Sequence, residues 1–164
     1  MADKSNFTPD EWKLLLESVM MAGIAVSAAD PSGLWGLLKE SFAGGAALTK
    51  VATDANANAL IKAVVADFST SEGRSTARDG LKAEFAGAKP PEIKTKSIDS
   101  LRQVSALLAA KALGDAAAFK DWLRQISQST AEAASEGGSL FGGGVQVSNA
   151  EKATLGEIST ALEI

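Results

Sequence analysis

The side chains of this sequence that could perform acid–base or nucleophilic chemistry are carboxylates and lysines, because Cys, His and Tyr are absent. That absence excludes disulfides, thiolate nucleophiles, His-ligated metal centres and the Ser-His-Asp triad. The acidic residues are dispersed along the chain, which leads us to expect no metal and no cofactor. These residues include Glu11, Glu17, Glu40, Asp54, Asp67, Glu72, Glu84, Asp115 and Glu151.

One polar cluster, made of Asp30, Ser32, Lys39 and Glu40, has a spacing that could bind a ligand. Asp30 and Ser32 stand at the start of an expected helix, where the helix dipole favours anions, and such turns can line a pocket. Helix capping explains the same two residues equally well. Lys39 and Glu40 would then be solvated neighbours, so both interpretations stay open.

A glycine-rich loop covers residues 137–144 and contains Gly142 and Gly143. Consecutive glycine amides ahead of a helix could hold a phosphate, which makes these two residues candidate ligand contacts. However, the Gly-Lys-Ser/Thr of a phosphate-binding loop does not follow, and no strand precedes the loop. The alternative interpretation is a simple connection between helices, with Leu140 and Phe141 packed into the core.

A second polar run, Asp54 to Asn58, alternates Asp and Asn in a way that resembles part of a calcium loop. It lacks the glycine and the distal glutamate that such a loop requires. We therefore interpret it as the polar start of a helix. Trp12, Trp35 and Trp122 fall on apolar helix faces, so we expect them in the core, with a partner for each buried indole N–H.

Helices are the elements expected to position these residues, because alanine is abundant and the apolar residues recur at helical spacing. Capping boxes at Thr8–Glu11 and Ser148–Glu151 mark two helix starts. The expected helices cover residues 8–28, 32–43, 46–68 with an interruption near Thr53, 71–85, 97–113, 115–135 and 148–162. The sequence therefore predicts an all-α, single-domain bundle of five to seven helices.

Pro90 and Pro91 suggest the clearest break in the chain. Proline cannot continue a helix, and it restricts the residue before it. We therefore predict a linker over residues 89–96 that joins two packed halves, 1–88 and 97–164. Each half alone would have only a marginal core, so both should belong to one domain spanning residues 1–164.

The net charge of −4 and an isoelectric point of about 4.9 argue against nucleic acid as a partner. The longest apolar run, Val19 to Ala29, is about half the length of a membrane span, and it is interrupted. The first residues also lack the basic region of a signal peptide. We therefore expect no membrane partner and a cytoplasmic location.

Two segments of the chain carry a resemblance to other sequences. The first runs from Phe7-Thr8-Pro9-Asp10-Glu11-Trp12 to Asp30-Pro31-Ser32-Gly33 and Lys39-Glu40, and the second from Glu136-Gly137-Gly138 to Glu151-Lys152-Ala153. Together they resemble a group of small bacterial helical proteins without an established function. The resemblance implies an all-helical fold, and it implies no activity, cofactor or catalytic residue.

These observations leave three hypotheses about function. The first is a non-enzymatic interaction or scaffold protein of the bacterial cytoplasm, because catalytic groups are few and slim Ala-rich helix faces could pack against a protein partner or a second copy. The second is a small-molecule-binding bundle with Asp30 to Glu40 and the glycine-rich loop as walls. The third, less favoured than the others, is an enzyme that uses carboxylate and lysine groups.

Overall fold

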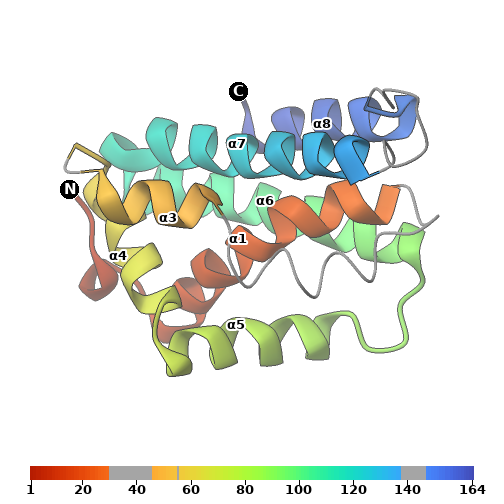
Figure 1. Ribbon diagram of the computed structural model, residues 1–164. Coiled ribbons are helices and arrows are strands. Elements are labelled where there is room, and N and C mark those ends of the chain that lie inside the picture. Colours follow the sequence, from red (N-terminus) through yellow and green to blue (C-terminus); the bar gives the residue numbers. More distant parts are fainter. Residues whose placement is uncertain (30–45, 55, 138–146) are drawn as a thin grey trace.

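The computed structural model describes residues 1–29, 46–54, 56–137 and 147–164, and within them the chain folds as a single all-α bundle (Figure 1). These residues form seven α-helices and no strand, as the sequence predicted. The helices are α1 (Pro9–Ala29), α3 (Ala46–Thr53), α4 (Ala59–Phe68), α5 (Ser71–Glu84), α6 (Pro90–Lys111), α7 (Leu113–Gly137) and α8 (Asn149–Leu162), and a short 3-10 turn, η1 (Lys4–Asn6), precedes them.

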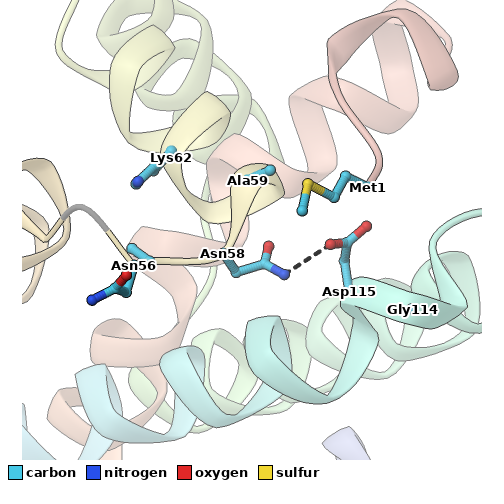
Figure 2. Close-up of a pocket in the computed structure, with 8 residues that line it drawn as sticks. Met1, Asn56, Asn58, Ala59, Lys62, Gly114 and Asp115 are labelled. Atoms are coloured by element: carbon cyan, nitrogen blue, oxygen red, sulfur yellow. Dashed lines mark hydrogen bonds between the residues drawn. The ribbon is translucent and has the colours of Figure 1, made fainter.

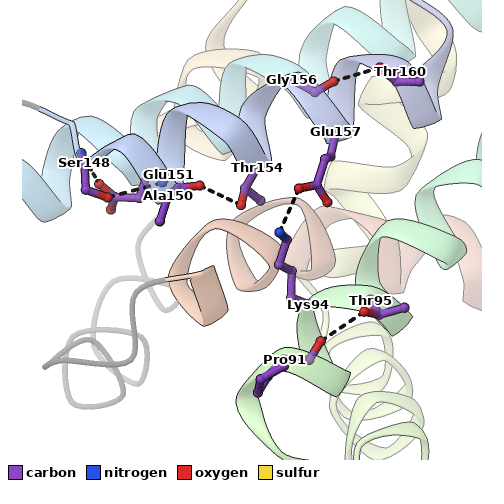
Figure 3. Close-up of polar contacts among 10 residues, drawn as sticks. All are labelled: Pro91, Lys94, Thr95, Ser148, Ala150, Glu151, Thr154, Gly156, Glu157 and Thr160. Atoms are coloured by element: carbon purple, nitrogen blue, oxygen red, sulfur yellow. Dashed lines mark hydrogen bonds and ion pairs between the residues drawn. The ribbon is translucent and has the colours of Figure 1, made fainter.

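Both predicted capping boxes are present. The Thr8 N–H donates to Glu11 Oε2 over 2.7 Å, and the Glu11 N–H donates to Thr8 Oγ1 over 3.3 Å. The same reciprocal pair joins Ser148 and Glu151 at the start of α8, at 2.8 and 3.2 Å (Figure 3). Each box satisfies backbone N–H groups that the first helical turn leaves unpaired, so local sequence alone determines where these helices begin.

Helix α1 is the central helix of the bundle and contacts α5, α6, α7 and α8. Although its uninterrupted apolar run is short, α1 as a whole is long and apolar enough to cross a membrane by length and composition alone, and most of it is buried inside the bundle. The largest completely buried side chains come from several helices. They include Leu15, Leu16, Met21, Leu60, Leu101, Leu108, Phe119, Leu123, Ile158 and Leu162.

The expected linker over residues 89–96 is wrong, because α6 begins at Pro90. Proline is well tolerated in the first turn of a helix, where its missing N–H would have no partner. The Lys89 N–H donates to Glu92 Oε2 over 2.7 Å and fixes the start of the helix. The chain reverses just before this point, where Gly87 adopts a positive φ of 71°.

The predicted interruption near Thr53 is confirmed, because α3 ends at Thr53 and α4 starts at Ala59. Asn58 caps α4, and its Oδ1 accepts hydrogen bonds from the N–H groups of Leu60 and Ile61 at 2.9 and 3.3 Å. The interpretation of this polar run as a helix start is therefore correct. The helix expected over residues 32–43 lies outside the described residues, as does most of the glycine-rich loop.

Helix α8 is joined to α6 by an ion pair between Lys94 Nζ and Glu157 Oε1, at 2.8 Å (Figure 3). A second contact at the other end of α8 involves Glu163, whose Oε2 accepts hydrogen bonds from Ser105 Oγ at 2.7 Å and Lys120 Nζ at 3.3 Å. These hydrogen bonds hold the pKa of Glu163 below its usual value. The last helix is thus fastened to α6 at two points and to α7 at one.

Candidate functional site

The six candidate ligand contacts of the sequence, Asp30, Ser32, Lys39, Glu40, Gly142 and Gly143, lie outside the described residues. They stay predictions. We build the site from three other places in the described residues where polar side chains gather away from solvent.

The first is a hollow of about 530 Å³ between the N-terminal segment, the α3–α4 connection and the start of α7 (Figure 2). We name it the Asn58 hollow. Its wall is formed by Met1, Asn56, Ala57, Asn58, Ala59, Lys62, Gly114 and Asp115.

Asp115 forms the floor of the Asn58 hollow and is only 4% exposed. Its Oδ1 accepts a hydrogen bond from Asn58 Nδ2 at 2.8 Å, and its Oδ2 accepts one from the Ala2 N–H at 2.7 Å (Figure 2). Asn58 thus uses its two amide atoms for two purposes, capping α4 with oxygen and binding α7 with nitrogen. Because both oxygens of Asp115 are engaged, this carboxylate ties three segments of the chain together.

The lining of the Asn58 hollow offers amide groups, the charged side chains of Lys62 and Asp115, and apolar carbon. Pockets that bind small molecules combine these features, with a few polar groups that orient the ligand. The hollow combines these features at a volume of about 530 Å³.

The second place is the contact between α1 and α5, which we name the Glu17 junction and define by Lys13, Glu17, Gly80 and Glu84. Glu17 is only 6% exposed, and its Oε1 has no hydrogen-bond partner among the described residues. The ammonium group of Lys13, on the same helix, lies 3.6 Å from this oxygen. Burial raises the pKa of Glu17, Lys13 opposes this shift, and the nearby Glu84 adds to it.

Gly80 allows α5 to lie directly on the Glu17 carboxylate. A Cβ atom at position 80 would lie 1.6 Å from Glu17 Oε1 and 2.5 Å from Lys13 Cε. Glu84, one turn further along α5, accepts a hydrogen bond on its side chain from Ser100 Oγ of α6, at 3.0 Å. Its backbone oxygen accepts another from Lys96 Nζ, at 2.6 Å. The junction therefore brings two carboxylates, one satisfied and one not, to the meeting point of three helices.

The third place, which we name the Asp67 corner, joins the end of α4 to the first turns of the chain. Asp67 Oδ2 accepts hydrogen bonds from the Trp12 indole N–H at 2.6 Å and from Lys4 Nζ at 2.9 Å. Burial alone would raise the pKa of Asp67, but the hydrogen bonds from Lys4 and Trp12 bring it below its usual value. Phe7 packs against Trp12, with ring centroids 5.9 Å apart.

The expectation that buried indoles find partners is confirmed for Trp12 and wrong for Trp122. Trp122 is 5% exposed, and its Nε1 has no hydrogen-bond partner in the described part of the chain. Its ring instead meets Phe119 edge-on, with centroids 5.4 Å apart. Aromatic packing therefore positions this side chain without the polar contact that its N–H group could make.

Sequence reasoning did not single out the Glu17 junction or the Asp67 corner. Lys13 and Glu17 have the i,i+4 spacing of an ordinary solvated pair, and Trp12 and Asp67 are far apart in the chain. One available signal was Gly80, a helix-disfavouring residue inside an otherwise polar helix.

Among the described residues, no group of three or more acidic side chains could hold a metal ion. No protein-family model, no curated protein and no solved structure matches this chain. The fold therefore identifies the chain as an all-helical protein of 164 residues, and the comparisons assign it to no family.

Proposed function

We propose that this chain is a non-enzymatic interaction or scaffold protein of the bacterial cytoplasm, of the kind represented by the small helical proteins that two of its segments resemble. The observation that supports this proposal best is an exposed leucine with small exposed neighbours in the sequence, where α6 ends and α7 begins. We name this stretch the Leu113 patch, and it consists of the exposed residues Ala109, Ala110, Leu113, Gly114, Ala117 and Ala118. Lys111, which lies between them in the chain, pairs with Glu11 at 2.6 Å.

Leu113 is 77% exposed, which is unusual beside the complete burial of Leu101, Leu108 and Leu123 in the same two helices. Burying one leucine side chain contributes about 1.5–3 kcal/mol. The small neighbours of Leu113 would let another backbone approach closely. A protein partner or a second copy that covers Leu113 would therefore gain free energy.

The test is sedimentation velocity over a wide concentration range, combined with capture of partners from a bacterial lysate. Leu113→Glu should weaken self-association or partner retention by about tenfold or more, because it places a charge where the patch must become dry. Gln125→Glu is the matched control, since Gln125 is exposed on α7 about 18 Å further along the same helix. It adds the same charge and should leave binding unchanged.

Two results would contradict the proposal. One is a wild-type chain that stays strictly monomeric and retains no partner from the lysate. The other is equal binding by Leu113→Glu and the wild type, which would show that any association uses a different surface.

The Asn58 hollow favours a second candidate function, the binding of a small molecule. Its volume of about 530 Å³ falls within the range of ligand pockets. A screen of small polar metabolites by thermal shift should then find compounds that stabilise the wild type. That stabilisation should be lost in Asn56→Trp, which fills the hollow, and kept in Gln125→Trp, a control on the exposed face of α7.

A further inference from the structure

Helix α5 is held to the bundle by a small apolar anchor. Its buried residues are Gly73, Ala77, Gly80 and Leu81, of which only Leu81 has a large side chain. Helix α6, by contrast, buries Ile93, Ile98, Leu101, Val104 and Leu108. Elements with little buried apolar surface open locally at low free-energy cost. Helix α5 is therefore the long helix in the described residues whose attachment is most sensitive to a single polar contact.

That contact is the Glu17 junction. At Gly80 the backbone of α5 lies against Glu17 Oε1, so closely that no side chain would fit between them. A carboxylate in this position has lost its water on one side and has not gained a hydrogen bond in return. Its one compensating charge, Lys13 Nζ, lies 3.6 Å away on a side chain that is 42% exposed.

The charged groups around Glu17 increase its sensitivity to protons. Lys13 acts on it from α1, Glu84 from α5, and Lys96 of α6 is engaged with the backbone oxygen of Glu84. Because Glu84 carries the same sign, ionisation of Glu17 places two negative charges across the α1–α5 contact. A protonated Glu17 removes that repulsion and can donate its own hydrogen bond.

We propose that Glu17 is a proton-dependent latch for α5, which holds the helix against α1 when the carboxyl is protonated and loosens it when the carboxyl is ionised. The direction follows from linkage. Burial raises the pKa of Glu17 above its ordinary value of 4.5, so the seated form binds the proton more tightly than the opened form. The attachment of α5 therefore weakens as pH rises from that value. The inference does not depend on the proposed function, since it concerns a different face of the bundle.

The test is hydrogen exchange followed by mass spectrometry on the full chain, at about pH 5 and about pH 7.5, with protection factors corrected for the intrinsic pH dependence of amide exchange. In the wild type, protection of residues 71–84 should fall by about threefold to tenfold between the two pH values, while residues 93–108 of α6 keep theirs. Glu17→Gln removes the titration and should abolish the difference.

Two further variants show whether the pH response comes from Glu17 itself. Glu72→Gln is the matched control, because Glu72 is exposed on the same helix and its loss should leave the pH response intact. Lys13→Met removes the cation near Glu17 and should enlarge the response. A wild type with no pH response in α5 would overturn the latch, and so would a response that survives in Glu17→Gln.

Discussion

The Asp67 corner and the Glu17 junction each contain a carboxylate that is partly or fully buried, but the surroundings shift the pKa values of the two groups in opposite directions. Asp67 receives an indole N–H and an ammonium group on one oxygen, and its pKa is lowered. Glu17 is buried against a helix backbone with a cation at 3.6 Å, and its pKa is raised. Burial disfavours both charges, but Glu17 is the more deeply buried and also faces Glu84, whereas Asp67 receives hydrogen bonds from Lys4 and Trp12 that outweigh its burial.

The comparison separates two roles of acidic residues in this fold. Asp67 fastens the N-terminal turns to α4, and its charge stabilises the folded chain. Glu17 fills a place where two helices approach closely, and its charge opposes folding at neutral pH. Five substitutions test this distinction, in order of decreasing effect.

The largest effect is expected for Asp67→Ala, which should lower the free energy of unfolding by about 2–3 kcal/mol at pH 7. The substitution leaves the Trp12 indole N–H, in a residue that is 3% exposed, without a partner. Urea unfolding followed by circular dichroism measures the loss. Asp79→Ala is the control, because Asp79 is exposed and accepts a hydrogen bond from Ser75 Oγ of the same helix, at 3.2 Å. Similar losses in both variants would remove the special role of Asp67.

Gly80→Ala should cost about 1 kcal/mol, at the low end for an overpacked site, because the new Cβ forces the ends of the Glu17 and Lys13 side chains to move and both side chains are flexible. Helix propensity alone predicts the opposite, a gain of up to about 1 kcal/mol. Gly156→Ala in α8 isolates that gain, since nothing lies within 4 Å of the added Cβ there. If both variants become more stable, α5 does not lie on Glu17 as closely as described.

Glu17→Gln should raise the free energy of unfolding by about 1 kcal/mol at neutral pH, because it removes a buried charge and keeps the shape of the side chain. A raised pKa means that the cost of the carboxylate appears as pH rises above 4.5, so the gain should vanish on acidification. Thermal unfolding at several pH values measures both results.

Asp67→Asn should change the free energy of unfolding in the opposite direction to Glu17→Gln when it is measured in the same way. Because the pKa of Asp67 is lowered, the advantage of the wild type should be present above the ordinary value of 3.8 and disappear as pH falls through the lowered one. Parallel pH profiles for the two variants would contradict the distinction between the two carboxylates.

The smallest effect is expected for Glu157→Gln, which should cost about 0.5 kcal/mol. Its ion pair with Lys94 spans only 2.8 Å, but the glutamate side chain is 48% exposed. The loss should shrink in high salt, because solvent screens exposed charges. Equilibrium unfolding with and without added salt measures this loss. The result shows how much an exposed carboxylate contributes, for comparison with the partly buried Asp67 and the buried Glu17.

The sequence predicted the helical class and the helix starts well, because both depend on local chemistry. The boxes at Thr8 and Ser148 and the cap at Asn58 need only residues within three positions of each other. Pro90 led to the wrong prediction of a linker because local chemistry alone was considered there. A proline that ends one helix and a proline that begins another have the same effect on the residue before them.

The polar contacts between helices could not be predicted in this way. Trp12 meets Asp67, and Asn58 meets Asp115, across more than fifty positions of chain. Burial of Glu17 depends on which helix covers α1 at that point, and only the packing of α5 decides it. The candidate contacts at Asp30, Ser32, Lys39, Glu40, Gly142 and Gly143 remain predictions that the described residues do not test.

The double use of Asn58 has a consequence for the chemical ageing of the protein. Its amide is the only side chain of this length that offers an acceptor to α4 and a donor to Asp115 at once. Deamidation of Asn58 to aspartate would keep an acceptor for the cap and replace the donor with a second carboxylate facing Asp115. One slow covalent event would thus set two negative charges against each other between α4 and α7, and the usable lifetime of the folded chain would depend on how firmly the start of α4 keeps the Ala59 backbone nitrogen from attacking that amide.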